Sequence, residues 1–294
     1  MSTLIDILKK TEEFLRKKDI PNSRFEAECI LSKALKCQRI DLYLKHAAKL
    51  SDGQLTDIRA LLTRRANREP LQYIVGEWPF HDLALSVDPR ALIPRPETEE
   101  LVELLMKKFS KYKDANLSIL DIGTGSGAIA LALAKYFRRS RVLASDFSAD
   151  ALDLARKNAA LNSIRSVIFV QSDWYAGITG TFDLIVSNPP YLSEKEWEQT
   201  QPEIKNFEPK LALCAGDEGR ADLLKIIDQS AQFLKTNGVL ALETGESQHQ
   251  LLLEFARIKF QLIESLKDRA LRDRFMILSR PKSQLLNRDT PLIQ

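Results

Sequence analysis

The chain has 294 residues, of which 44% are hydrophobic and 28% charged, and its formal net charge is +3 at pH 7. These values exclude a disordered chain and are typical of a folded protein with one large or two ordinary domains. The chain start lacks a basic stretch followed by an apolar core, and no uninterrupted apolar segment approaches about 18 residues, so we expect neither a signal peptide nor a membrane span.

The three cysteines, Cys29, Cys37 and Cys214, form no C-x-x-C pair, and the three histidines lie far apart in the sequence. A structural zinc site or a disulfide framework would need closely spaced ligands or an even set of cysteines. We therefore expect reduced cysteines, no metal site and a cytoplasmic protein.

Residues 1–75 predict a small all-helical domain, because apolar residues recur there with a period of about 3.6, as at Leu4 and Leu8. The tetrapeptides Ser23–Glu26 and Ser51–Gln54 match the capping box, in which two side chains satisfy free backbone donors at a helix start. They predict helices that begin near residues 23 and 51.

Residues 76–95 are rich in proline and contain short apolar alternations, a texture that predicts a β-hairpin or an extended linker. Pro96 is suited to the first turn of a helix, and the glutamates after it complement the positive helix N-terminus. We expect a second domain over 96–284 and a loose tail over 285–294.

The second domain alternates apolar strands with amphipathic helices, which predicts an α/β fold with a mostly parallel sheet and helices on both faces. The predicted strands cover residues 117–123, 141–146, 167–173, 182–188, 239–245 and 274–280. The predicted helices cover residues 127–137, 148–162 and 221–235, the last ending at Asn237-Gly238.

A glycine-rich loop, Asp121-Ile122-Gly123-Thr124-Gly125-Ser126-Gly127, connects the first of these strands to its helix. Glycines there let the backbone approach a ligand, and the helix N-terminus directs N–H groups at it. The same loop satisfies the dinucleotide fingerprint, so by itself it leaves NAD, S-adenosylmethionine and a plain tight turn open.

Acidic residues end the next two strands. Asp146 is placed to bind ribose hydroxyls of either cofactor. Asp173 offers a carboxylate to an exocyclic amine, and Trp174 offers an indole that could stack on adenine. A tryptophan is more often a core residue, but the carboxyl edge of an α/β sheet is where such folds bind ligands.

The fourth strand ends in Asn188-Pro189-Pro190-Tyr191. Proline fixes φ and pushes the preceding residue into an extended conformation, so the backbone carbonyls here are rigidly aimed and have no strand partner. Asn188 adds a side-chain carbonyl and Tyr191 a flat ring. The segment predicts a binding site for a planar NH₂ group. The alternative, purely structural interpretation is a proline turn that ends a strand.

Such a binding site suits methyl transfer to nitrogen. An amide or aryl amine nitrogen has its lone pair delocalised, so it attacks a methyl-sulfonium only when its hydrogens are bound and the lone pair is aligned. Adenine and glutamine amides both carry this group.

The chain resembles the HemK/PrmC family, which methylates the glutamine of the Gly-Gly-Gln motif in class 1 peptide chain release factors. The resemblance covers residues 1 to about 280 and rests on Tyr73–Gly76, Leu92–Glu99, Asp121–Gly127, Ser172–Trp174, Asn188–Tyr191 and Phe207–Pro209. It implies a class I methyltransferase fold with a seven-stranded sheet, preceded by the helical domain and the hairpin. Leu271 and Arg220 depart from the family pattern, which usually has glycine and leucine there.

The resemblance also implies the roles of the site residues. S-adenosylmethionine would contact Gly123, Thr124, Gly125, Ser126, Gly127, Asp146, Trp174 and Asn188. Asp173, placed after the third strand, is a further expected contact of the cofactor. Asn188, Pro189, Pro190 and Tyr191 would hold the glutamine amide, with Asn188, Pro189 and Tyr191 as the catalytic set. The loop over 94–99 would help close the site, and the helical domain would dock the release factor. We expect a monomer that binds neither membrane nor nucleic acid as substrate.

Two alternatives remain. An adenine-N6 methyltransferase would use the same binding site, although the sequence has no inserted target-recognition domain and no strongly basic stretch for phosphate contacts. A non-catalytic adapter for release factors or ribosomes would not need the glycine loop, Asp146 and Asn188 together. An NAD oxidoreductase would have no use for the Asn-Pro-Pro-Tyr segment.

Overall fold

The computed structural model describes residues 3–282 and divides into two compact units. The first unit contains the chain up to Trp78 together with Gln201–Phe207, and the second contains Pro79–Thr200 and the chain from Glu208 onward. The tail expected over 285–294 lies outside the described residues, and the domain boundaries expected at 75 and 95 stay predictions. In the described part of the chain, no helix is both long enough and apolar enough to cross a membrane.

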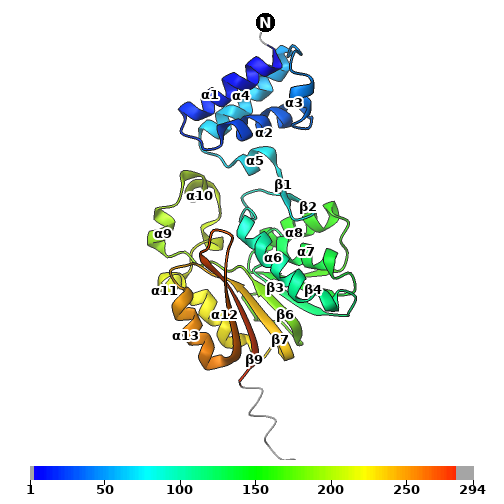
Figure 1. Ribbon diagram of the computed structural model, residues 1–294, viewed down its shortest axis with the longest axis vertical. Coiled ribbons are helices and arrows are strands. Elements are labelled where there is room, and N and C mark those ends of the chain that lie inside the picture. Colours follow the sequence, from blue (N-terminus) through cyan, green and yellow to red (C-terminus); the bar gives the residue numbers. More distant parts are fainter. Residues whose placement is uncertain (1–2, 283–294) are drawn as a thin grey trace, which may run out of the picture. The chain divides into compact units, whose positions relative to one another are not determined.

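The first unit is helical (Figure 1). Its helices are α1 (Leu4–Lys17), α2 (Ser23–Leu35), α3 (Asp41–Leu44), α4 (Asp52–Ala66), α5 (Leu71–Val75) and α10 (Pro202–Phe207). Its core consists of apolar side chains that repeat with the helical period, among them Leu8, Leu15, Ile30, Leu31 and Leu42.

The two predicted capping boxes have different outcomes. Ser51 and Gln54 form the expected reciprocal bonds at the start of α4. The helix α2 does begin at Ser23, but the capping box there is wrong, because the N-cap is Asn22 and its side chain makes no cap bond. The carboxylate of Glu26 is bound elsewhere: it accepts hydrogen bonds from the Arg65 guanidinium, at 2.6 Å from Nε.

A hairpin, β1 (Glu77–Phe80) and β2 (Leu83–Ser86), lies within the segment predicted to be a hairpin or linker, and the boundary between the two units falls inside β1, after Trp78. A seven-stranded sheet follows, in the order β5-β4-β3-β6-β7-β9-β8. Its strands are β3 (Ser118–Ile122), β4 (Arg141–Asp146), β5 (Val167–Gln171), β6 (Phe182–Ser187), β7 (Leu234–Glu243), β8 (Phe260–Lys267) and β9 (Asp273–Pro281). The first five are parallel and β9 is antiparallel to both its neighbours, so the predicted α/β sheet is confirmed.

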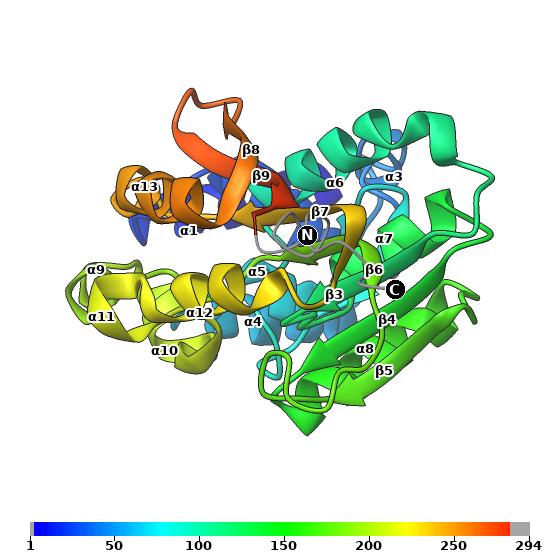
Figure 2. The same ribbon diagram turned by 90° about the horizontal axis from the view of Figure 1, so that it is seen from below.

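Helices cover both faces of this sheet (Figures 1 and 2). Side chains of α6 (Pro96–Lys108) and α7 (Ala128–Tyr136) join one buried cluster with Ile119, Leu184 and Ala241. Side chains of α12 (Ala221–Ser230) and α13 (His249–Lys259) join a second cluster with Leu120, Ile185 and Leu240. Successive strand residues therefore alternate between two apolar cores. The remaining helical segments of the unit are α8 (Ala149–Leu161), α9 (Glu194–Glu198), α11 (Gly216–Gly219) and the short 3₁₀ turns η1 (Ser110–Tyr112) and η2 (Lys210–Ala212).

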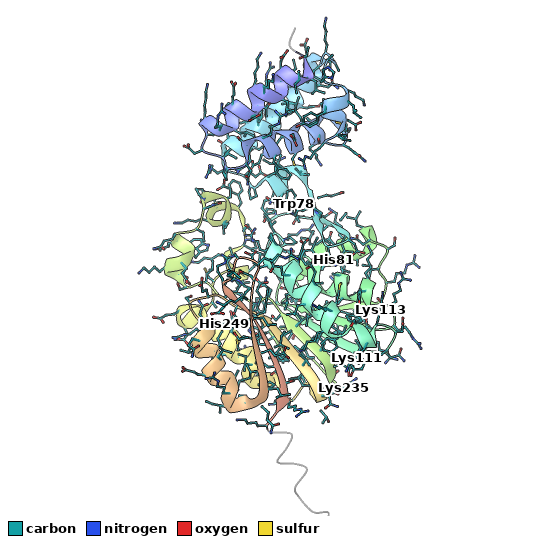
Figure 3. The ribbon with its side chains drawn as sticks, viewed as in Figure 1. Trp78, His81, Lys111, Lys113, Lys235 and His249 are labelled. Carbon is teal, nitrogen blue, oxygen red and sulfur yellow. The ribbon has the colours of Figure 1, made fainter. Side chains whose placement is uncertain are left out.

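The helix predicted to run to residue 235 ends earlier, at Ser230. The Phe233 N–H bonds the Ser230 carbonyl in a turn, and the Phe233 carbonyl accepts from Phe182 N–H at 2.8 Å, so the chain already pairs with β6. The strand β8 and the helix α13 are further elements that the sequence pattern did not predict. His249 (Figure 3) starts α13 as a buried residue, with Nδ1 2.7 Å from Thr244 Oγ1 and Nε2 2.7 Å from Ser265 Oγ.

Candidate active site

A cavity of about 360 Å³ lies at the carboxyl edge of β3, β4 and β6 in the second unit. Parallel strands bring their carboxyl ends to one edge, so residues distant in sequence meet there. The lining comes from the 90–98 loop, the glycine loop, the ends of β4, β5 and β6, and η2. Predicted site residues in it are Gly123, Thr124, Gly125, Ser126, Asp146, Asp173, Trp174, Asn188 and Pro190.

Gly127 is required where the glycine loop enters α7. Its φ is +83°, in the left-handed region that favours glycine. A Cβ there would also lie 3.1 Å from the Ala155 Cβ and 3.3 Å from Leu131 Cδ1. The lining includes Gly123 to Ser126 but not Gly127. The glycine at 127 lets the loop pass close to Ala155 of α8 where α7 begins.

Asp121 stabilises the glycine loop through hydrogen bonds to the loop and to the start of α7. Its Oδ2 accepts from Thr124 Oγ1 at 2.6 Å and from the Ala130 N–H at 3.1 Å, which satisfies a free donor in the first turn of α7. Burial raises the pKa of Asp121 to about 7. Its Oδ1 is buried and has no hydrogen-bond partner among residues 3–282.

Asp146 ends β4 and binds two backbone donors. Its Oδ2 accepts from Gly125 N–H at 2.8 Å and its Oδ1 from Ser148 N–H at 2.9 Å. Burial raises the pKa of this carboxyl above its ordinary value. Each carboxylate oxygen has a second acceptor site, so hydroxyl groups of a ligand can still be bound.

Asp173 and Trp174 follow β5. Asp173 is exposed and pairs with Lys225 at 3.2 Å. Trp174 has a positive φ of 52° and packs against the second apolar cluster while also lining the cavity. Trp174 is therefore a partly buried core residue that also borders the cavity, and its stacking on a ligand stays a prediction.

The Asn-Pro-Pro-Tyr segment lies where β6 ends, but only part of it lines the cavity. Asn188 and Pro190 do so, whereas Pro189 is buried. Asn188 is half-buried, and its Nδ2 donates to Thr98 Oγ1 at 3.0 Å. The Tyr191 hydroxyl donates to Glu243 Oε1 at 3.3 Å, and burial raises the tyrosine pKa. The wall role of Tyr191 and the aim of the Pro189 carbonyl stay predictions.

Glu208 anchors the loop that covers this edge. Its Oε2 accepts from Ile93 N–H at 3.0 Å and its Oε1 from Arg95 Nη2 at 2.5 Å. Two separate parts of the family resemblance, Leu92–Glu99 and Phe207–Pro209, are thereby joined through this one carboxylate. The loop over 94–99 continues into α6, whose first turn carries Thr98.

Several residues of this edge carry little signal in the sequence pattern that marks them as site residues. Thr98 was predicted only as part of a closing loop, and Glu243 was not singled out. Glu243 is the last residue of β7, is 1% exposed, and accepts from Thr98 Oγ1 at 2.8 Å. Its position at a strand end, like that of Asp146, was the one available signal. Other missed lining residues are Arg90, Phe147, Leu211, Ala212 and Asp222.

The lining suits a ligand with positive charge and ribose hydroxyls. Asp146, Asp173 and Asp222 line the cavity. Asp173 is paired with Lys225, and the two lining arginines are paired with acids, Arg90 with Asp88 at 2.7 Å and Arg95 with Glu208.

The chain matches two protein families along its length. A family described as the PrmC N-terminal domain matches residues 6–76, and one described as the methyltransferase small domain matches residues 98–205. The chain is 37% identical over 277 residues to a release factor glutamine methyltransferase of Fusobacterium nucleatum, covering 93% of this chain and 78% of that protein. A release factor glutamine methyltransferase of Thermodesulfovibrio yellowstonii is 39% identical over 260 residues, covering 88% of this chain and 93% of that protein.

A solved methyltransferase structure from Pyrococcus furiosus has a TM-score of 0.50 and 20% identity, covering 68% of this chain and 89% of that chain. At this identity the likeness concerns the fold alone, which is the class I methyltransferase fold. The helical first unit, the methyltransferase second unit and the similarity over nearly the whole chain agree with one another. The chain belongs to the family of release factor glutamine methyltransferases.

Proposed function

We propose that this protein transfers a methyl group from S-adenosylmethionine to the side-chain amide nitrogen of the glutamine in the Gly-Gly-Gln motif of class 1 release factors. The observation that carries the proposal is the placement of Asn188. Its amide donates to Thr98 and its side chain lines the cavity at the end of β6, so its carbonyl oxygen is available to a ligand.

S-adenosylmethionine supplies an electrophilic methyl group on a sulfonium. The glycine loop, Asp146, Asp173 and Trp174 would hold it, and the acidic lining favours its positive charge. The rest of the reaction is positioning. Asn188 Oδ1 and the Pro189 carbonyl would each accept one hydrogen of the glutamine NH₂ group, which turns the nitrogen lone pair toward the methyl group.

The proton balance requires no strong base. When the nitrogen gains a methyl group it keeps one hydrogen and releases the other as a proton, and a nitrogen-methylated amide cation loses that proton readily to water. The protein therefore has to bind the hydrogens of the substrate amide and hold its nitrogen in line with the methyl group. It does not have to remove a proton from the amide before methyl transfer. Asn188 and the two rigid prolines are suited to that task.

We further propose that the first unit docks the release factor, that the protein acts as a monomer, and that it works in the cytoplasm. The family match over residues 6–76 supports the docking role. A protein substrate needs a recognition surface larger than the cavity, and a separate helical unit can supply one.

The experiment incubates the purified protein and labelled S-adenosylmethionine with a release factor, with the same factor carrying asparagine in place of the motif glutamine, and with duplex DNA. We expect one added methyl group on the motif glutamine, located by mass spectrometry, and none on the other two. Label in DNA alone would assign the protein to the adenine methyltransferases. Tight release-factor binding without cofactor binding in calorimetry would make it an adapter.

A further inference from the structure

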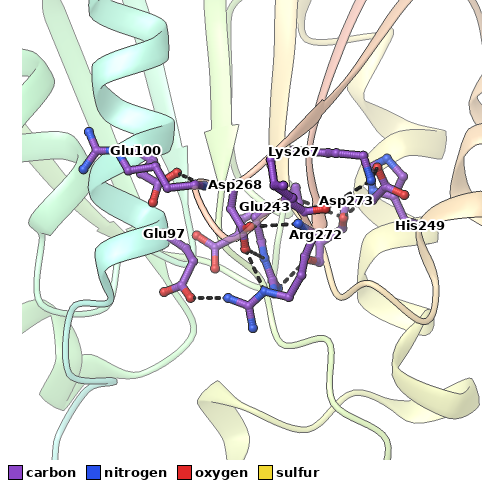
Figure 4. A network of polar contacts seen from close by, with 12 residues as sticks. Glu97, Glu100, Glu243, His249, Lys267, Asp268, Arg272 and Asp273 are labelled. Atoms are coloured by element: carbon purple, nitrogen blue, oxygen red, sulfur yellow. Dashed lines mark hydrogen bonds and ion pairs between the residues drawn. The ribbon is translucent and has the colours of Figure 1, made fainter.

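Glu243 is a buried carboxyl beneath the Asn-Pro-Pro-Tyr segment. It ends β7 and is 1% exposed. Figure 4 shows it at the same edge as the ion pair between Arg272, from the β8–β9 turn, and Glu97 on α6, which are 2.8 Å apart. Burying a carboxyl is costly, so its two hydrogen bonds at this site need an explanation.

The first bond begins a chain of two hydrogen bonds that ends at Asn188. Thr98 Oγ1 donates to Glu243 Oε2 at 2.8 Å, and Asn188 Nδ2 donates to Thr98 Oγ1 at 3.0 Å. A threonine hydroxyl has a single hydrogen. Because the carboxylate accepts that hydrogen, Thr98 can only accept from Asn188, and only the NH₂ side of the asparagine amide can donate. The carbonyl side must then point away from Thr98.

The second bond holds the other end of the segment. The Tyr191 hydroxyl donates to Glu243 Oε1 at 3.3 Å. One carboxyl therefore contacts the segment through Thr98 at Asn188 and directly at Tyr191, with the two rigid prolines between them.

We propose that Glu243 and Thr98 are positioning residues that fix the amide orientation of Asn188, so that its carbonyl oxygen and not its NH₂ group faces the substrate amide. The inference rests on the proposed function, because it states how the site accepts the hydrogens of a glutamine or adenine NH₂ group. With the asparagine turned over, two NH₂ groups would face each other.

Two nearly isosteric variants test the proposed orientation of the Asn188 amide. Glu243→Gln can donate to Thr98, which frees the threonine hydrogen for Asn188 and permits the turned amide. Thr98→Val keeps the shape and removes the hydroxyl. We expect each to lower kcat by about 10²-fold, the cost of one misplaced hydrogen-bonding group in a site of this kind. Cofactor affinity in calorimetry should stay within about threefold, because the change acts on orientation rather than on binding.

Controls separate positioning from folding. Thr98→Ser keeps the hydroxyl and should restore most of the kcat lost in Thr98→Val. Thr244→Val removes a neighbouring buried hydroxyl, which lies 2.7 Å from His249 Nδ1, and should lower stability without lowering kcat. Equal losses of kcat in the Thr98→Ser and Thr98→Val variants would contradict the proposal.

A double-mutant cycle gives the sharpest result. If Glu243 acts through Asn188, adding Glu243→Gln to Asn188→Ala should cause no further loss of kcat. Multiplied losses would mean that Glu243 acts by another route, and the proposal would be overturned. An unchanged kcat in Glu243→Gln, with wild-type protein active on the release factor, would refute the positioning role while leaving the proposed function intact.

A readout without turnover covers the case in which the release factor is not the substrate. The side-chain amide resonances of Asn188 are identified in a ¹⁵N-labelled protein by their loss in Asn188→Ala. We expect Glu243→Gln and Thr98→Val to shift them and Thr244→Val to leave them in place. Unshifted resonances in the first two variants would refute the orientation role whatever the substrate is.

Discussion

Asn188 is the residue on which the proposed chemistry depends most directly. Replacing it with alanine removes the acceptor for one hydrogen of the substrate amide, and we expect kcat to fall by about 10²- to 10³-fold. The glycine loop and Asp146 remain, so cofactor affinity measured by calorimetry should change little. Unchanged turnover would refute the role, and loss of cofactor binding alone would make Asn188 chiefly a cofactor contact.

Glu243 gives the reaction a predicted pH dependence. Burial raises its pKa to about 7. Four neighbours act on that value: Thr98, Arg274 and Tyr191 lower it and Glu97 raises it. Above pH 7 the carboxylate can only accept, which keeps Asn188 oriented; below it, the neutral acid can donate to Thr98 and release the amide. In wild-type protein kcat should therefore rise with pH through about 7.

The comparison with Glu243→Gln isolates this group. The variant cannot titrate at that position, so the rise in kcat near pH 7 should be absent from its profile. Single-turnover measurements between pH 5.5 and pH 8.5, which are roughly one and a half pH units on either side of that pKa, check this. An identical rise in both proteins would assign it to another group, for which Asp121, with a pKa also raised to about 7, is the first to examine.

Some site residues could be predicted because the signal for each lies within one short segment of the sequence. The glycine loop, Asp146 and the Asn-Pro-Pro-Tyr segment each follow an apolar strand, and the carboxyl ends of parallel strands meet. The choice of a glutamine amide over adenine came from family resemblance. Thr98 and Glu243 could not be paired in advance, because they are separated by 145 positions and only the fold brings them together.

The turn between β8 and β9 contains a residue whose backbone conformation is strained. Leu271 has a φ of 63° and is 76% exposed. A residue with a Cβ in the left-handed region destabilises the folded protein by roughly 1–2 kcal/mol. Replacing it with glycine removes this strain but also increases the conformational entropy of the unfolded chain, which offsets part of the gain in stability.

We therefore expect Leu271→Gly to raise the free energy of unfolding by about 0.5–1 kcal/mol. The check is urea denaturation, in which the midpoint should rise and the slope stay constant. Leu271→Ala is the matched control, since it shortens an exposed side chain but keeps the Cβ, and it should remain near wild type. A Gly variant no more stable than the Ala variant would show that the turn is not strained.

The elements that the sequence did not predict have physical reasons. The strand β8 is mostly exposed, so it lacks the alternation that reveals a half-buried strand. The residues after Ser230 kept a helical apolar pattern, yet Phe233 and Leu234 pair with Phe182 of β6, and tertiary pairing prevailed over propensity. At the start of α2, Glu26 binds Arg65, a partner no local pattern contains.

At the scale of the whole molecule, a buried ion cluster joins distant parts of the chain within the first unit. Arg65 lies 2.6 Å from Glu26 and 2.9 Å from Glu203 of α10, and its side chain is 4% exposed. Removing it leaves the Glu26 carboxylate without its partner, while Glu203 keeps Arg68 at 3.1 Å. A buried carboxylate that loses its partner is strongly destabilising, so we expect Arg65→Ala to cost about 3–5 kcal/mol of stability.

Its neighbour Arg64 is the matched control. Arg64 pairs with Glu69 on the surface, with a side chain 44% exposed, and Arg64→Ala should cost at most about 1 kcal/mol. Denaturation of the two variants measures the difference, and limited proteolysis should cut Gln201–Phe207 faster in Arg65→Ala alone. Equal stability of the two variants would show that the cluster does not hold this segment.

The division of the first unit between two stretches of chain also sets an order of events during synthesis. The residues up to Trp78 emerge roughly 130 positions before Phe207 does. At about 5–20 residues per second, the ribosome needs about 7–26 s to make that stretch. Throughout this interval Arg65 and Glu26 lack Glu203, so the first unit emerges early but completes its ion cluster only after much of the methyltransferase sheet has been translated.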